Sequence, residues 1–176
     1  MRARNGMLTT VRGALALALW LPLLAWAQTA DLAAPELPPA EIVPVTTHTA
    51  ALTQFGNGNT AELTQGGSRQ FADIVQNGLG NRLTVSQLDA LNRIVASQSG
   101  DLNQALLQQF GSENLISLAQ TGVANVANVT QTGTLNTASI EQLGNGNTAD
   151  VQQTGIGFNV VVRQLGDGNV ARVIQF

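Results

Sequence analysis

The stretch QSGDLNQALLQQ, residues 98–109, begins and ends on glutamine and holds the pattern that decides the fold. A glutamine recurs every eleven residues from Gln54 to Gln175 without a break. Glycine follows two positions after it, asparagine five positions after it, and apolar residues stand seven and nine positions after it. Residues 54–176 are therefore a tandem array of eleven-residue units.

The recurring polar and turn residues form three sets. The glutamines are Gln54, Gln65, Gln76, Gln87, Gln98, Gln109, Gln120, Gln131, Gln142, Gln153, Gln164 and Gln175. The glycines, interrupted once by Asp89, are Gly56, Gly67, Gly78, Gly100, Gly111, Gly122, Gly133, Gly144, Gly155 and Gly166. The asparagines, replaced twice by Gln70 and Phe158, are Asn59, Asn81, Asn92, Asn103, Asn114, Asn125, Asn136, Asn147 and Asn169.

The spacing inside one unit distinguishes a strand from a helix. An eleven-residue period also suits a helix in a right-handed coiled coil. However, the asparagine, the two apolar residues and the next glutamine stand two positions apart, so they share one side of a strand, whereas a helix would scatter them. A glycine in ten of the eleven units would also cost a helix about 1 kcal/mol each time. Each unit is predicted to be a strand followed by a tight turn at G-x-x-N, where glycine and asparagine tolerate positive φ.

Two strands and two turns close one rung of 22 residues. The predicted fold is all-β: a β-solenoid of two parallel cross-β sheets made of eleven units, about five and a half rungs and roughly 25 Å tall. The glutamines and asparagines would lie inside as amide ladders. A buried amide is costly without a hydrogen-bond partner, and an identical amide one rung away supplies that partner.

Charged residues support the 22-residue rung, because residues that far apart should lie above one another. No two like charges in the repeats are separated by 22 positions, whereas Glu141 with Arg163 and Asp150 with Arg172 are opposite pairs. We expect both pairs on the outer surface, where each adds little stability but favours the correct register.

The first 27 residues are predicted to be a secretory signal peptide. Arg2, Arg4 and Arg12 form a basic region, an apolar run covers 13–24, and small residues at 25 and 27 suit cleavage after position 27. The alternative is an uncleaved anchor, but the apolar run is shorter than the ~20 residues of a membrane span. The expected location is extracellular.

Residues 28–50 carry four prolines and are predicted to form an extended linker, with the repeat domain covering 51–176. His48, the sole histidine, lies in this linker and is interpreted as an incidental residue. The chain has no cysteine, which excludes a disulfide scaffold. Its net charge of −3 argues against nucleic acid as a partner, and no metal or other cofactor is expected.

A solenoid enzyme acting on polysaccharide would gather carboxylates on one face. Here Asp89 and Asp101 fall in turns while Asp73 and Asp150 fall on strands, so no catalytic residues are assigned. Soluble solenoids need capping repeats, and none is visible in this sequence. Open strand edges template the addition of another chain, which favours a self-polymerising fibre over a monomeric β-solenoid adhesin.

The unit Q-x-G-x-x-N-x-A-x-x-x-Q resembles the repeat of the curlins, the subunits of bacterial curli amyloid fibres, over residues 54–176. The segments 63–69 with its QGGS turn, 74–76, 81–82 and 171–175 are most similar to the minor curlin subunit. That resemblance implies a surface-attached nucleator that templates the major subunit and supports adhesion and biofilm. It also implies export through an outer-membrane channel and contact with an accessory surface factor. A major fibre subunit is the alternative.

The last two units differ from the others. Three valines at 160–162 place apolar groups on both faces of their strand. The resemblance favours an attachment surface here, whereas the plain alternative is sequence drift at a terminus. The residues expected to form the surface are Arg163, Val170, Arg172 and Ile174.

Overall fold

The computed structural model describes residues 9–11 and 47–176, and every regular element in these ranges is a β-strand. Sheet A has the order β1-β2-β4-β6-β8-β10-β12, and sheet B has the order β3-β5-β7-β9-β11-β13. The strands of sheet A are β1 Thr9–Val11, β2 Thr49–Asn57, β4 Phe71–Leu79, β6 Arg93–Asp101, β8 Leu115–Val123, β10 Thr137–Leu143 and β12 Asn159–Leu165. Those of sheet B are β3 Thr60–Gln65, β5 Arg82–Ala90, β7 Gln104–Ser112, β9 Val126–Thr134, β11 Thr148–Ile156 and β13 Val170–Gln175.

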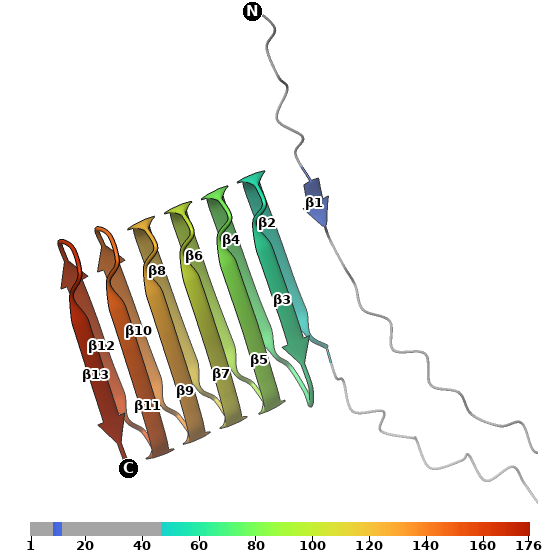
Figure 1. Cartoon of the computed structure of the whole chain (residues 1–176). Helices are drawn as coiled ribbons and strands as arrows, with labels where there is room; N and C mark the ends of the chain where they lie inside the picture. The colour runs from blue at the N-terminus through green and yellow to red at the C-terminus, as the bar shows by residue number, and fades with distance from the viewer. Residues whose placement is uncertain (1–8, 12–46) are drawn as a thin grey trace, which may run out of the picture.

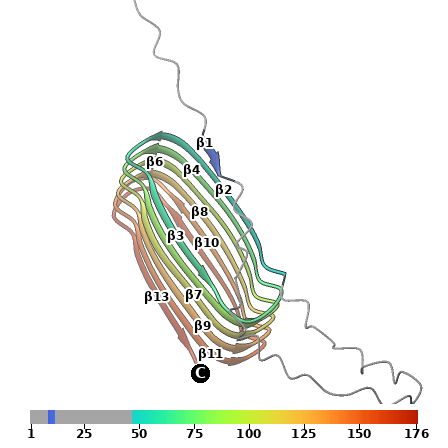
Figure 2. The same cartoon turned by 90° about the vertical axis from the view of Figure 1, so that its right-hand side faces the viewer.

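From β2 onward the chain alternates between the two sheets, and each strand pairs in parallel with the strand two places along the sequence (Figure 1). Every residue in these parallel ladders is 22 positions from its partner, as in Gln76 with Gln98 and Gln87 with Gln109. Viewed at right angles to Figure 1, the successive rungs superimpose as a flattened coil (Figure 2). The predicted β-solenoid with 22-residue rungs is confirmed.

The stack has six rungs, where about five and a half were expected. The difference arises at the start, because β2 begins at Thr49 and so adds a strand ahead of the first repeat glutamine. Thr49 and Ala50, assigned to the linker from the sequence, pair with Phe71 and Ala72 in sheet A. His48 comes directly before this strand and is exposed.

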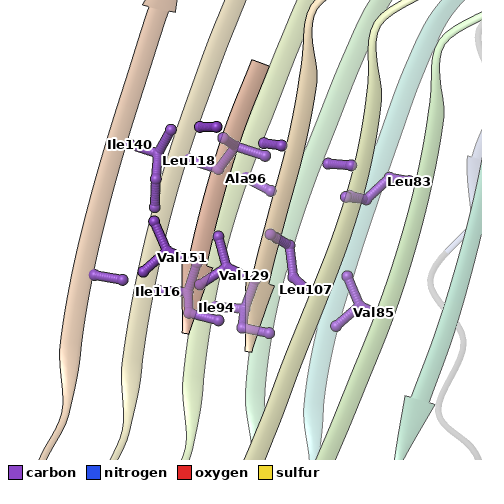
Figure 3. Close-up of a cluster of buried hydrophobic side chains, with 14 of the residues drawn as sticks. Leu83, Val85, Ile94, Ala96, Leu107, Ile116, Leu118, Val129, Ile140 and Val151 are labelled. Atoms are coloured by element: carbon purple, nitrogen blue, oxygen red, sulfur yellow. The ribbon is translucent and has the colours of Figure 1, made fainter. Parts of the chain in front are cut away.

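The core lies between the two sheets and follows the predicted two-residue alternation. In β6, Ile94, Ala96 and Gln98 are buried, and the residues between them point outward. The same pattern in both sheets creates one continuous apolar column, part of which Figure 3 shows from Leu83 to Val151. Parallel in-register stacking therefore packs each inward-facing apolar side chain against its equivalents one rung away and against the opposite sheet.

Each turn contains two residues with positive φ, two and four positions after the glutamine. The first is a predicted turn glycine in every unit except that of Asp89, whose φ is 77°. The second is often not glycine, as at Leu102 with φ 58°. No asparagine in the described residues has positive φ, so the predicted role of asparagine in the turn backbone is wrong. Its importance comes from its side chain instead.

Strand β1 pairs antiparallel with β2 at the outer edge of sheet A, with Thr10 opposite Thr53. These three residues belong to the segment predicted to be a signal peptide. The rest of that segment, and the linker up to residue 46, lie outside the described residues. The part of the chain that the structure describes contains no helix long and apolar enough to cross a membrane.

Candidate functional site

The glutamine side chains form two columns, one in each sheet. In sheet A, Gln54 Nε2 donates to Gln76 Oε1 at 2.6 Å, and the same bond repeats from rung to rung up to Gln164. In sheet B the column runs from Gln65 to Gln175, with distances between 2.8 and 3.0 Å. All the bonds point the same way, from each rung toward the C-terminal end of the stack.

The second proton of each interior glutamine amide ties the two sheets together. Nε2 of Gln98 also donates to the backbone carbonyl of Arg82, the first residue of a strand in the opposite sheet, at 3.1 Å. Equivalent bonds recur at a separation of 16 residues in the interior rungs. A glutamine at this position therefore satisfies both of its amide protons while fully buried.

The asparagines form the other ladders, at the corners of the rung. We call the turns from sheet A to sheet B the asparagine corner, because all six of its rungs carry asparagine at the ladder position: Asn59, Asn81, Asn103, Asn125, Asn147 and Asn169. The backbone N–H and the side-chain Nδ2 of Asn103 both donate to Asn81 Oδ1, at 3.0 and 3.1 Å. Nδ2 of Asn103 also donates to the carbonyl of Gly122 at 2.9 Å, one rung ahead.

We call the turns from sheet B to sheet A the mixed corner, because its ladder positions hold Gln70, Asn92, Asn114, Asn136 and Phe158. Gln70 Oε1 accepts from the backbone N–H of Asn92 at 3.1 Å, as an asparagine would. The backbone N–H of Phe158 donates to Asn136 Oδ1 at 3.0 Å, but its phenyl ring ends the ladder there. In the described residues, every buried side-chain nitrogen and oxygen has a hydrogen-bond partner.

The turn glycines are required by close approach as well as by φ. A Cβ on Gly100 would collide with the backbone carbonyl of Gly122 in the next rung, and Gly56, Gly78 and Gly144 meet the same obstacle. At Gly155 the obstacle is a side chain instead, because an added Cβ would lie 2.6 Å from Cε2 of the Phe158 ring. Stacked turns therefore pack backbone against backbone, which leaves no room for a Cβ at Gly56, Gly78, Gly100 or Gly144.

Both opposite-charge pairs lie where the 22-residue rung placed them. Arg163 Nε is 2.8 Å from Glu141 Oε2 on sheet A, and Arg172 Nε is 3.5 Å from Asp150 Oδ2 on sheet B. All four side chains are about half exposed or more, so their contribution to stability is small. The pairs mark the register of the last two rungs.

The four residues expected to form an attachment surface do not share one face. Val170, Arg172 and Ile174 alternate along the outward side of β13 in sheet B, where Val170 is 78% exposed. Arg163 points outward from β12 in sheet A. Successive units belong to opposite sheets, so the sequence alone could have shown that Arg163 lies on a different sheet from the other three residues. The outward side of β13 remains a mixed apolar and basic strip.

The two ends of the stack have complementary ladder groups. At the N-terminal end, Gln54 and Gln65 present Oε1 atoms that receive no ladder bond from the described residues. At the C-terminal end, no rung follows Gln175 and Asn169 in the described residues. The strands β12 and β13 each have one parallel neighbour there. A shallow hollow at this end is lined by Gln164, Asn169 and their neighbours. In residues 47–176 no group of acidic or histidine side chains is placed to hold a metal ion.

The comparison with protein families agrees with this architecture. The model of the curlin associated repeat matches residues 56–88, 92–122 and 124–155, which together make up more than half of the chain. No individual curated protein matched the sequence. A coil of stacked, amide-laddered rungs, in which β3, β12 and β13 each have one unpaired edge among the described residues, is a structural, fibre-forming module. The chain belongs to the curlin-repeat family and is a structural subunit of the curli type.

Proposed function

We propose that this chain is the surface-attached nucleator of an extracellular curli-type fibre, which starts the polymerisation of a homologous major subunit and so supports adhesion and biofilm formation. The observation that carries the proposal is the pair of complementary ends, with strand edges unpaired at β3, β12 and β13. An incoming repeat chain finds a parallel strand edge with glutamine and asparagine groups already in register. Ordered edges of this kind are templates for strand addition.

The N-terminal region fits export in this proposal. Cleavage after Ala27 would remove β1 from the edge of β2 and release a chain whose linker, residues 28–48, ends where β2 begins at Thr49. An outer-membrane channel would export that chain. The outward strip of Val170, Arg172 and Ile174 is the proposed contact with an accessory surface factor, because an exposed apolar patch beside a charged group suits a protein partner.

A seeding assay tests the proposed function. Residues 28–176 are diluted from denaturant, and amyloid-dye fluorescence is followed for this chain alone and for traces of it added to a homologous major subunit. Self-assembly together with loss of the partner's lag phase is the expected result. Self-assembly without an effect on the partner would assign the chain as a major subunit. A stable monomer without dye response would leave a monomeric adhesin.

The attachment strip is tested separately on cells. In the double variant Val170→Thr and Ile174→Thr, the exposed apolar groups of β13 are lost while the core-facing residues remain. We expect fibres to form but to be released into the medium. The matched control is Val161→Thr, which is 72% exposed on β12 in the other sheet. Equal retention of both variants on cells would remove the strip from the proposal.

A further inference from the structure

The charges at the two ends of the stack match when one copy follows another without a break in register. In sheet B, the residue that would lie one rung beyond Arg172 of β13 is Glu62 of β3 in the next copy. This follows because one column on the outer face holds Glu62, Thr84, Leu106, Asn128, Asp150 and Arg172. Continuing that column places Arg172 between Asp150 of its own chain and Glu62 of the following copy.

The geometry of Arg172 leaves room for this second partner. Its contact with Asp150 is a loose one at 3.5 Å through Nε, and its side chain is 69% exposed. A guanidinium carries five N–H donors, so its remaining donors can bind another carboxylate. Glu62 is exposed and has only Thr84 as its neighbour in the column within its own chain.

The other columns continue through the same junction. Gln175 and Gln164 of one copy would lie next to Gln65 and Gln54 of the following copy. In both glutamine columns an amide donor of the first copy then faces an acceptor oxygen of the second. Asn57 of the following copy would lie one rung after Asp167. In this column Asn145 and Asp167 each accept a hydrogen bond from the backbone N–H of the preceding rung, and Asn57 can do the same. Joining two N-terminal ends would instead place glutamine Oε1 acceptors against each other.

We propose that, once cleavage after Ala27 has removed β1 from β2, a second copy of this chain stacks its first rung, β2 and β3, on the last rung, β12 and β13, and that an ion pair between Arg172 and Glu62 of the next copy selects this head-to-tail register. The proposal rests on the proposed function as a self-assembling subunit and adds the polarity of the assembly and its charge code. The copies then point the same way along the fibre, with their linkers emerging once every six rungs.

Charge reversal at Glu62 tests the junction. Glu62→Arg places an arginine against Arg172 of the preceding copy, but within its own chain the residue directly opposite is the neutral Thr84. We expect self-seeded elongation to slow by about threefold to tenfold, because an exposed attraction becomes a repulsion of similar size.

The matched control is Asp73→Arg, which makes the same charge change at the same position of a unit. Asp73 lies in β4, inside the stack, and faces the neutral Val95. Each site also has an arginine diagonally across the ladder, Arg82 beside Glu62 and Arg93 beside Asp73, so the two variants share that local cost. Asp73→Arg should therefore elongate like the unmodified chain.

A complementary variant provides the rescue. The double change Asp150→Arg and Arg172→Glu keeps an opposite pair inside the chain but places the introduced carboxylate at position 172 against Glu62 of the next copy. This variant alone should therefore also elongate slowly. In an equimolar mixture with Glu62→Arg, every junction between the two variants is attractive. We expect the mixture to elongate faster than either variant alone, and the difference to shrink at about 1 M salt, where the Debye length is only ~3 Å.

The outcomes distinguish a failure of the proposed junction from a failure of the proposed function. If the unmodified chain does not self-assemble, the proposed function fails and the junction with it. If the unmodified chain and Asp73→Arg assemble alike, and Glu62→Arg matches them at low salt, the fibre stands but this register is wrong. Slow elongation of Glu62→Arg without rescue in the mixture would also overturn the specific pairing, since the reversed charges would then act by another route.

Discussion

The two corners of each rung perform the same turn with different residues. The asparagine corner has asparagine at all six ladder positions and glycine at all six tight positions that precede them. The mixed corner starts its ladder on Gln70, ends it on Phe158 and carries Asp89 in place of one glycine. The exceptions in the ladder stand in the first and last rungs of this corner. A ladder residue in an interior rung must form hydrogen bonds with the rung on each side, whereas a ladder residue in a terminal rung has only one neighbouring rung to bond with.

The exceptions also show which property of asparagine the ladder uses. Gln70 Nε2 donates to the carbonyls of Gly66 and Asp89 at 3.0 and 2.9 Å. Nδ2 of Asn92 donates to the equivalent carbonyls four residues back and one rung ahead. An amide that reaches these two carbonyls and offers an oxygen to the next rung is therefore sufficient. Phe158 meets none of these demands with its side chain, and its ring lies over Gly155 instead.

Moving the phenylalanine into the asparagine corner should have the largest effect. Asn125 is fully buried, donates to Asn103 Oδ1 and to the Gly144 carbonyl, and accepts from Asn147. Asn125→Phe leaves those groups unpaired, and no vacant turn lies above to take the ring. We expect a loss of about 4 kcal/mol or more in the free energy of unfolding, measured by urea titration with circular dichroism.

Thr132→Phe is the control for that variant. Thr132 is exposed in the mixed corner and pairs in register with Phe110, so a second phenyl ring at this column is accommodated. It should unfold within about 1 kcal/mol of the unmodified chain. If Asn125→Phe were equally mild, the ladder would not be a structural requirement of the interior rungs.

An intermediate effect is expected from exchanging the turn residues that distinguish the corners. Gly122→Ala in the asparagine corner adds a Cβ that collides with the Gly144 carbonyl at a φ of 122°, at a cost of about 3 kcal/mol. Asp89→Gly in the mixed corner removes only an exposed hydrogen bond from Gly111 N–H at 2.8 Å, and relieves a positive φ. That change should stay within about 1 kcal/mol. Equal urea midpoints for the two variants would contradict the difference between the corners.

The smallest effect should come from repairing the first position of the mixed ladder. Gln70→Asn exchanges one laddering amide for another, and we expect a change below about 1 kcal/mol. Gln70→Ala removes the amide that pairs with Asn92, Gly66 and Asp89, and should cost about 2 kcal/mol. Urea titration of the two variants side by side distinguishes them. A Gln70→Asn variant as weak as Gln70→Ala would show that the length of the glutamine, and not its amide, matters there.

Much of this architecture was predictable because identical residues at a fixed spacing permit few structures. The two-residue alternation predicted the buried face, and two strands with two turns predicted the 22-residue rung, which the charge pairs Glu141 with Arg163 and Asp150 with Arg172 supported. The second left-handed position was not predictable, since Leu102, Glu113 and Gly146 occupy it with no common chemistry. Its conformation is imposed by the stacked turns around it. The strand at Thr49 was missed because the first rung begins ahead of the first repeat glutamine.

The opposed directions of the two amide ladders have an electrical consequence. Each glutamine amide directs its nitrogen toward the C-terminal end, whereas each asparagine in the asparagine corner directs its oxygen that way. Amide groups are dipoles, and dipoles aligned head to tail add along a column. Because the glutamine and asparagine columns run antiparallel to each other, their fields oppose. The partial charges that the two kinds of column place at each end of the stack are therefore opposite in sign and cancel in part, however many rungs the stack contains.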